Sequence, residues 1–107
     1  MKKIIISTGE AIPGKKVVEI LGIVKGNTVR ARNIGRDLGA SFKNLVGGEV
    51  KTYTEMSVQS RDEAYNRMIN EAIRLGADAI IGMKFMTSMI MQGASEMLAY
   101  GTAVKLD

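Results

Sequence analysis

The sequence contains no cysteine and no histidine among its 107 residues. Without cysteine there is no disulfide, no thiol nucleophile and no thiolate metal ligand. Without histidine the protein lacks the side chain that most often acts as a general base near neutral pH, which excludes serine–histidine triads, zinc-hydrolase sites and imidazole ligands. Any proton transfer would depend on carboxylate, lysine or tyrosine side chains.

Long apolar runs are also missing. The longest stretch without a charged residue, residues 85–95, holds 11 residues, whereas a membrane-spanning helix needs about 20 mostly apolar ones. The isoleucines that follow Lys2 and Lys3 are too few for the apolar part of a secretory signal. We therefore expect a cytoplasmic protein with no membrane-spanning segment.

The composition is that of one globular domain, with 46% hydrophobic and 24% charged residues. We expect residues 1–107 to form a single domain with one core. The net charge of +4 comes from basic and acidic residues spread along the chain, without a block of like charges. Only three tyrosines and two phenylalanines are present, so nucleic-acid binding ranks last among the functions considered.

The first third of the chain has the pattern of short strands. Three isoleucines followed by Ser7 indicate a short strand at residues 4–7, and the β-branched run 17–24 indicates another. Residues 25–27 contain a glycine and an asparagine and predict a tight turn, after which residues 28–30 resume an extended course. This region is interpreted as strand, turn and strand.

Two helices are predicted in the middle of the chain. The first begins at Asn33, a good cap residue, and ends at the glycines Gly47 and Gly48. The second shows a capping box formed by Ser60 and Glu63, although apolar residues seven positions apart indicate that it could begin several residues earlier. Its apolar stripe, which Gly76 ends, consists of Tyr65, Met68, Ile69, Ala72 and Leu75.

The C-terminal part predicts a hairpin, with strands at residues 79–91 and 97–104 and a turn at residues 92–95. The order of strands, helices and hairpin predicts an α+β fold of two layers, in which helices pack on one face of a mostly antiparallel sheet.

The predicted strands are apolar on both sides. In a sheet covered by helices on one face, alternate residues should be polar, yet the strand 97–104 carries no charge on either side and the run 17–24 carries only Glu19. The helices are too few to cover both faces. We expect other copies of the chain to supply the missing cover as a closed homo-oligomer; a small barrel of two-sided strands is the alternative.

Four residues are candidates for ligand binding. Glu19 lies in an apolar run, where burial would suit it to proton transfer, but pairing with an arginine at a subunit contact is the favoured interpretation. Arg32 and Arg36, together with Arg30, surround the predicted helix start at Asn33, where free backbone N–H groups could bind phosphate or carboxylate. Asp37 lies within this cluster, so an arginine–aspartate network is an equal alternative. The candidates are Glu19, Arg32, Arg36 and Asp37.

Methionine is abundant, with eight residues, of which five lie in or beside the predicted hairpin: Met83, Met86, Met89, Met91 and Met97. Thioether sulfur is a soft ligand that suits monovalent copper. Alternation along a strand places Met83, Met89 and Met91 on one side and Met86 on the other, which favours packing in a core or an interface.

Several sequence blocks together resemble the YbjQ-like family, small bacterial and archaeal proteins of unknown activity that are often labelled "putative heavy-metal-binding". The blocks cover most of the chain: GKKVVEILGIVKG at 14–26, NIGRD at 33–37, VGG at 46–48, LGADAIIG at 75–82 and GTAVK at 101–105.

The resemblance implies a strand–helix–strand–strand subunit similar to that of dodecin, assembled as a ring that is a pentamer or a pair of pentamers. Relatives often carry acidic residues at the positions of Lys84 and Met86, so a carboxylate metal site cannot be carried over to this chain. A hard metal ion would have to be bound by groups such as Glu19, Asp37 or backbone carbonyls.

The leading hypothesis is a non-enzymatic, homo-oligomeric binding module whose subunit contacts form a pocket for a metal ion or a small anion near Glu19, Arg32, Arg36 and Asp37. One alternative is an enzyme that uses a carboxylate and an arginine at the subunit interface. The other is a structural scaffold that binds a protein partner.

Overall fold

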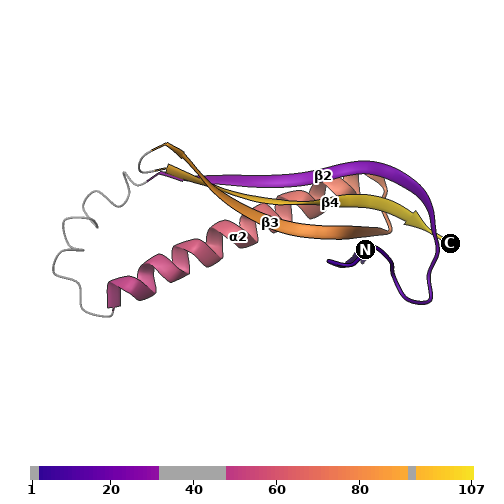
Figure 1. Ribbon diagram of the computed structural model, residues 1–107, viewed down its shortest axis with the longest axis horizontal. Coiled ribbons are helices and arrows are strands. Elements are labelled where there is room, and N and C mark those ends of the chain that lie inside the picture. Colours follow the sequence, from indigo (N-terminus) through magenta and orange to yellow (C-terminus); the bar gives the residue numbers. More distant parts are fainter. Residues whose placement is uncertain (1–2, 32–47, 92–93) are drawn as a thin grey trace.

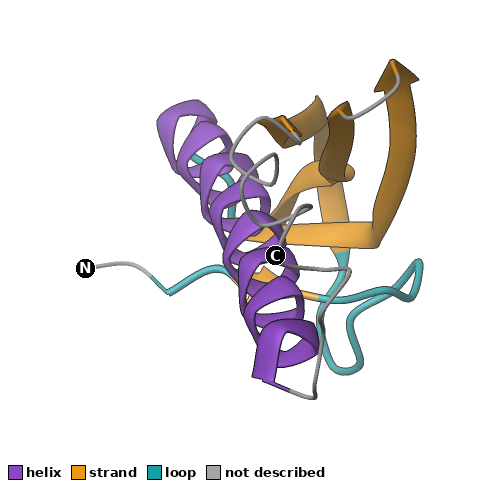
Figure 2. Cartoon of the chain, turned by 90° about the vertical axis from the view of Figure 1, so that its left-hand side faces the viewer, coloured by secondary structure: helices purple, strands orange, loops and turns teal. Residues whose placement is uncertain are grey.

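The computed structural model describes residues 3–31, 48–91 and 94–107, and the side chains of all of these except residues 31 and 48–55. The described elements are β1 (Ile5–Ile6), β2 (Val17–Ala31), α2 (Gly48–Leu75), β3 (Ala79–Met91) and β4 (Ala94–Leu106) (Figure 1). They form an α+β fold of two layers, with α2 on one side of a four-stranded sheet (Figure 2). The predicted helix that starts at Asn33 lies outside the described residues.

The sheet is mixed, with the strand order β1-β3-β4-β2. The central strand β4 pairs antiparallel with both β2 and β3, and the short strand β1 pairs parallel with β3. The predicted hairpin is therefore confirmed as β3 and β4, while the parallel pairing of β1 was not predicted. Among the described residues, β2 and the part of β3 beyond Met83 have a paired neighbour on one side only.

The predicted turn at residues 25–27 is wrong, because β2 continues without a break from Val17 to Ala31. Gly26 pairs with Ala99 of β4, and its Cα faces α2. A Cβ atom at this position would collide with the Ala64 carbonyl oxygen, the Met68 amide nitrogen and, at 2.6 Å, the Arg67 Cβ. The glycine thus allows the helix to lie directly on the strand.

The predicted capping box at Ser60 and Glu63 is also wrong, because α2 starts at Gly48, a residue expected to end the preceding helix. Ser60 lies inside α2, where its hydroxyl is 2.7 Å from the Thr28 hydroxyl of β2. Thr28 also donates a hydrogen bond to the Ser60 carbonyl oxygen at 2.9 Å. The serine therefore fastens the helix to the sheet.

The end of α2 at Gly76 is confirmed. Gly76 has a φ of 79°, its amide donates to the Ile73 carbonyl, and the Ala77 amide donates to the Ala72 carbonyl. This pattern satisfies the last helical carbonyls, and it needs a residue that tolerates the left-handed region.

The main core lies between α2 and the sheet. Its helix side uses buried residues of the predicted stripe, Met68 and Ala72, together with Ala64. The sheet side combines larger apolar residues with two alanines: Val24, Ile80, Met83, Ala99 and Ala103. A smaller cluster lies on the opposite side, where Ile12 packs on Ala79 and Val104.

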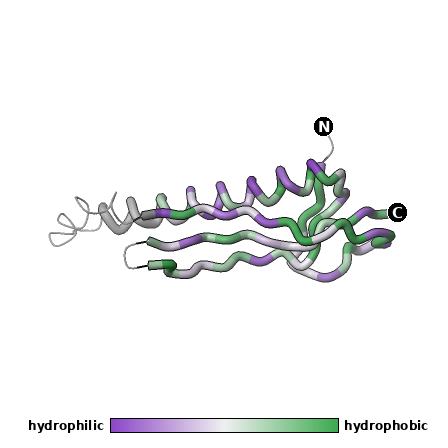
Figure 3. Tube along the Cα trace, turned by 90° about the horizontal axis from the view of Figure 1, so that it is seen from above, coloured by the Kyte–Doolittle hydropathy of each residue, from purple (hydrophilic) through white to green (hydrophobic). Residues whose placement is uncertain are grey.

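We call the side of the sheet that carries α2 the helix side and the opposite side the outer face. Outside the cluster around Ile12, the outer face has no cover from the described residues. Ile20 is 68% exposed and Ile23 is 72% exposed. Apolar stretches continue along the strands toward the hairpin end (Figure 3). No helix in the described part of the chain is long and apolar enough to cross a membrane.

Candidate functional site

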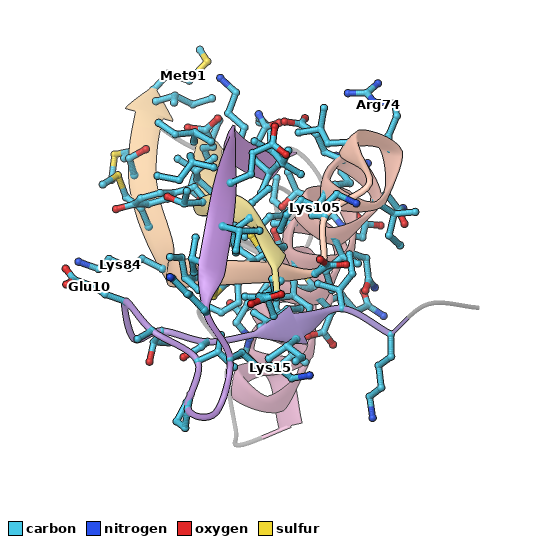
Figure 4. The ribbon with its side chains drawn as sticks, turned by 90° about the vertical axis from the view of Figure 1, so that its right-hand side faces the viewer. Glu10, Lys15, Arg74, Lys84, Met91 and Lys105 are labelled. Atoms are coloured by element: carbon cyan, nitrogen blue, oxygen red, sulfur yellow. The ribbon has the colours of Figure 1, made fainter. Side chains whose placement is uncertain are left out.

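Glu19 lies near the start of β2, with its side chain exposed. It is opposite Lys105 of β4 in the strand register, and the Lys105 side chain extends toward the end of α2, with its Nζ 3.7 Å from the position of a Cβ on Gly76 (Figure 4). The described residues form no ion pair with Glu19. Glu19 is therefore not buried in the protomer, and its pairing with an arginine of another subunit stays a prediction.

Arg32, Arg36 and Asp37 lie outside the described residues, so the structure does not bring them together with Glu19. Arg30, the remaining arginine of the predicted cluster, is described and points to the helix side. Its guanidinium lies 2.8 Å from the Glu63 carboxylate of α2. Arg30 therefore takes part in an arginine–carboxylate pair, but with a partner that sequence reasoning did not identify.

Arg67 extends this pair into a network across the helix–sheet contact. Its guanidinium lies 4.0 Å from the Glu63 carboxylate and donates to the Asn27 carbonyl oxygen of β2. On the other side of the sheet, the Asn27 amide donates to the Glu96 carboxylate at 2.9 Å. The side chains are largely exposed, and both carboxylates already have partners. The network therefore links α2 to β2 and β2 to β4, and it leaves no carboxylate available for a ligand.

Asp78, which belongs to the LGADAIIG block, joins three parts of the chain. Its carboxylate accepts a hydrogen bond from the Leu106 amide at 2.8 Å, its amide donates to the Val104 carbonyl, and its carbonyl accepts from the Ile5 amide. This aspartate ties the connection after α2 to β4 and to β1. Sequence reasoning did not identify this structural role, although the position of Asp78 directly after a helix end was a usable signal.

The hairpin methionines separate into two groups. Met83 is buried in the core and Met97 packs against it, so packing is confirmed for these two residues. Met86, Met89 and Met91 are 52%, 77% and 66% exposed. Met91 extends from the end of β3 (Figure 4). Within the protomer these three side chains fill no core, and their packing in an interface stays a prediction.

The predicted alternation of the methionines is wrong at Met91. Met89 is opposite Ser95, whereas Met91 is opposite Ala94, because β3 has one extra residue at this point. Residues opposite each other on antiparallel strands share a face, so Met89 lies on the helix side and Met91 on the outer face. The bulge therefore places Met91 on the face opposite to the one that simple alternation predicts.

In the described part of the chain, no three histidine, cysteine or carboxylate side chains are grouped so that they could bind a metal ion. The buried polar side chains there are those of Thr28 and Ser60, which bond to each other. The described residues thus bury no ionisable side chain that could act as a catalytic acid or base.

Comparison with known proteins gives consistent matches over nearly the whole chain. A UPF0145 protein of Archaeoglobus fulgidus is 58% identical over 105 residues, which is 98% of this chain and 97% of the relative. A UPF0145 protein of Thermotoga maritima is 56% identical over 96% of this chain and 97% of the relative.

A solved structure shares the fold. It is a crystal structure of a protein of unknown function from Pediococcus pentosaceus, assigned to the DUF74 family, and it matches with a TM-score of 0.64. The match covers 97% of this chain and 98% of that chain, at 22% sequence identity. At this identity the likeness concerns the fold alone.

The resemblance noted from the sequence blocks is confirmed by a family model. The model matches residues 4–107, and its description is "Putative heavy-metal-binding". The chain therefore belongs to the YbjQ family.

Proposed function

We propose that this protein is a non-enzymatic binding module that assembles from identical copies into a closed ring, a pentamer or a pair of pentamers of dodecin-like subunits. It would hold a metal ion or a small anion at the contacts between subunits. The single observation that carries the proposal is the exposed apolar outer face of the sheet, on which Ile20 and Ile23 are 68% and 72% exposed.

Two properties of this surface support a second copy as its cover. Large exposed apolar patches on soluble proteins mark association surfaces. The same sheet also ends in strands with unpaired edges, because β2 is paired only with β4 in the described residues. Proteins avoid leaving a long apolar edge strand open, since it invites pairing with another chain. Assembly of identical copies would cover the face and the edges together.

The proposed ligand position follows from Glu19. This exposed carboxylate lies on β2, the strand with a free edge, and so it would come close to a neighbouring copy. Arg32, Arg36 and Asp37 follow the other end of β2, about 40 Å from Glu19 along the strand, so a neighbouring copy would have to supply them to complete the proposed set. A carboxylate and arginines at one boundary would suit a small anion, or a cation that binds oxygen.

The assembly is tested by light scattering on size-exclusion fractions of three proteins. Wild type should be an oligomer, Ile23→Lys should have a lower mass, and Ile73→Lys should have the wild-type mass. Ile73 is the matched control because it is 51% exposed on α2, away from the outer face. A monomeric wild type, or an Ile23→Lys variant with unchanged mass, contradicts the proposed assembly.

The ligand is tested by thermal unfolding with a panel of divalent metal ions, phosphate and nucleotides. A ligand that binds only the folded form raises the melting temperature, and Glu19→Gln should reduce that rise while the oligomer mass stays the same. If no compound moves the melting temperature, the binding function loses its support, and a scaffold for a protein partner becomes the better explanation.

A further inference from the structure

We propose that Met89 and Met97 form a binding site for a soft monovalent metal ion, Cu⁺, on the helix side of the β3–β4 hairpin. The proposal assigns a new ligand set, separate from Glu19 and the arginines. It is made within one protomer and does not depend on the proposed ring.

The strand register brings the two methionines onto one face. Met97 is opposite Thr28 on β2 and opposite Thr87 on β3. Thr28 is buried beneath α2, so this row of residues lies on the helix side. Met89 lies two residues beyond Thr87 on the same side, diagonally across from Met97. Side chains in this diagonal relation have Cα atoms about 7–8 Å apart, within reach of long side chains.

The sulfur of Met97 has a defined position. The Thr87 hydroxyl donates a hydrogen bond to the Met97 Sδ at 3.3 Å. The Met97 side chain is therefore turned toward β3, with its sulfur close to Thr87. From there the next residue on the same side of β3 is Met89, about 6.6 Å further along the strand.

Met89 is free to complete the pair. It is 77% exposed, so the protomer does not fix its rotamer. Its side chain is unbranched with three rotatable bonds, and it can bring its own sulfur toward that of Met97. The backbone of α2 diverges from the sheet toward the hairpin end (Figure 1).

An aromatic residue occupies the other diagonal position next to Met97. Phe85 lies two residues before Thr87 on β3 and shares its face, since its partner Ala99 also lies on the helix side. The ring is 44% exposed, and its centroid is 6.1 Å from that of Tyr65 on α2. Phe85 is therefore a second neighbour of Met97 on the helix side.

The chemistry of the pair selects the ion. Thioethers are soft, neutral ligands that suit Cu⁺, whereas Mg²⁺, Ca²⁺ and Mn²⁺ prefer oxygen. Two thioethers are neutral, so the bound ion would keep its positive charge. Arg30 is close to this position, because Arg30 and Met89 both pair with Ser95 of β4. The Arg30 guanidinium lies 2.8 Å from the Glu63 carboxylate. This pairing reduces the repulsion that a free guanidinium would exert.

The chain offers matched control variants. Met91 is 66% exposed and close in sequence to Met89, but the bulge places it on the outer face. Met86 is 52% exposed and is opposite Leu98, also on the outer face. If exposed thioethers bound the ion without a defined site, these residues would contribute as much as Met89.

The test is calorimetric titration with Ag⁺, a redox-stable probe of Cu⁺ sites, in chloride-free buffer. Wild type should bind about one Ag⁺ per protomer, and Met89→Leu should weaken binding by about tenfold or more, the loss typical of a disrupted metal site. Met97→Leu should do the same, while Met91→Leu and Met86→Leu should bind as wild type does. Met89 is exposed, so its replacement leaves the fold intact.

A second readout is the ¹³C-methyl signal of each methionine. Ag⁺ should shift the Met89 and Met97 signals and leave the Met83 signal in place. The proposal is overturned if wild type shows no saturable binding, or if Met91→Leu weakens binding as much as Met89→Leu. Light scattering of the same samples keeps the two proposals apart, because an oligomer that does not bind Ag⁺ contradicts only the methionine site.

Discussion

Replacing Gly26 with alanine tests the contact on which the helix–sheet packing depends. Gly26 lies in the middle of β2 and has no positive φ, so alanine is compatible with its backbone conformation. The only difficulty is space, because the added Cβ would meet the backbone of Ala64 and Met68 and the Arg67 Cβ. The substitution therefore measures how closely α2 must lie against the strand.

The distances around Gly26 give the expected loss of stability. Carbon atoms in contact are about 3.5–4.0 Å apart, whereas the added methyl group would lie 2.6 Å from the Arg67 Cβ. The helix would have to retreat by roughly 1 Å, and the opposing atoms are backbone atoms that cannot turn aside. Overpacking a core costs about 1–3 kcal/mol, and we expect Gly26→Ala to lie at or above the upper end.

Two further glycines calibrate this value. At Gly101 an added Cβ would be 2.6 Å from the Cγ2 of the buried Ile80 and 3.1 Å from the Ile81 carbonyl oxygen, so we expect a cost within the same range of about 1–3 kcal/mol but below that at Gly26, where two of the three nearest atoms are backbone atoms in closer contact. At Gly9 the nearest atoms are 3.4 and 3.9 Å away, and Gly9→Ala should change stability by less than about 0.5 kcal/mol.

The assay is urea unfolding followed by helical circular dichroism, at one protomer concentration so that assembly contributes equally to each variant. The free energy of unfolding should fall in the order Gly9→Ala, Gly101→Ala, Gly26→Ala. A Gly26→Ala variant as stable as wild type would refute the close contact between α2 and β2.

Two other predictions concern the same helix–strand contact. Thr28→Val removes the hydrogen bonds to Ser60 and should destabilise the protein by about 1–2 kcal/mol. In the same urea assay, Thr28→Val with Ser60→Ala should cost less than the sum of the single changes, because neither hydroxyl is then left without the other. Glu63→Gln should cost less than about 1 kcal/mol, and the difference should shrink in 1 M salt, since Arg30 and Glu63 are 35% and 48% exposed.

The parts of the fold that the sequence predicted correctly are those with local causes. The hairpin follows from a change of periodicity after Asp78, and the end of α2 follows from Gly76, which takes the left-handed conformation that a helix stop requires. These signals need no knowledge of distant residues. The family resemblance also depended on local blocks, and it was confirmed.

The two main errors lie on opposite sides of one tertiary contact. Gly26 has the sequence context of a turn and Ser60 that of a helix cap, and both patterns are reasonable locally. In the structure Gly26 makes room for α2, and Ser60 bonds to Thr28 from inside the helix. A residue needed for a contact between distant segments can have the same sequence context as a turn or a helix cap. Only the three-dimensional structure shows which of the two roles it has.

The candidate site was less predictable for a different reason. Simple alternation assigned Met91 to the side of Met89, and one extra residue in β3 reversed it. Bulges have no sequence signature strong enough to be placed in advance, although each one moves all later side chains to the other face. The residues that could complete the site around Glu19 lie outside the described segments, so that hypothesis stays a prediction.

The distribution of side-chain size between the two faces explains why stability and assembly should be separable. Toward α2 the sheet presents Gly26, Ala99 and Ala103 beside the larger Val24, Ile80 and Met83, and all of these are buried by the helix. The large aliphatic residues Ile20 and Ile23 lie on the other face, where most of their surface is exposed. A polar substitution there removes little packing from the protomer. The outer face can thus be altered with little effect on folding, and a loss of assembly in such a variant would reflect the contact between copies itself.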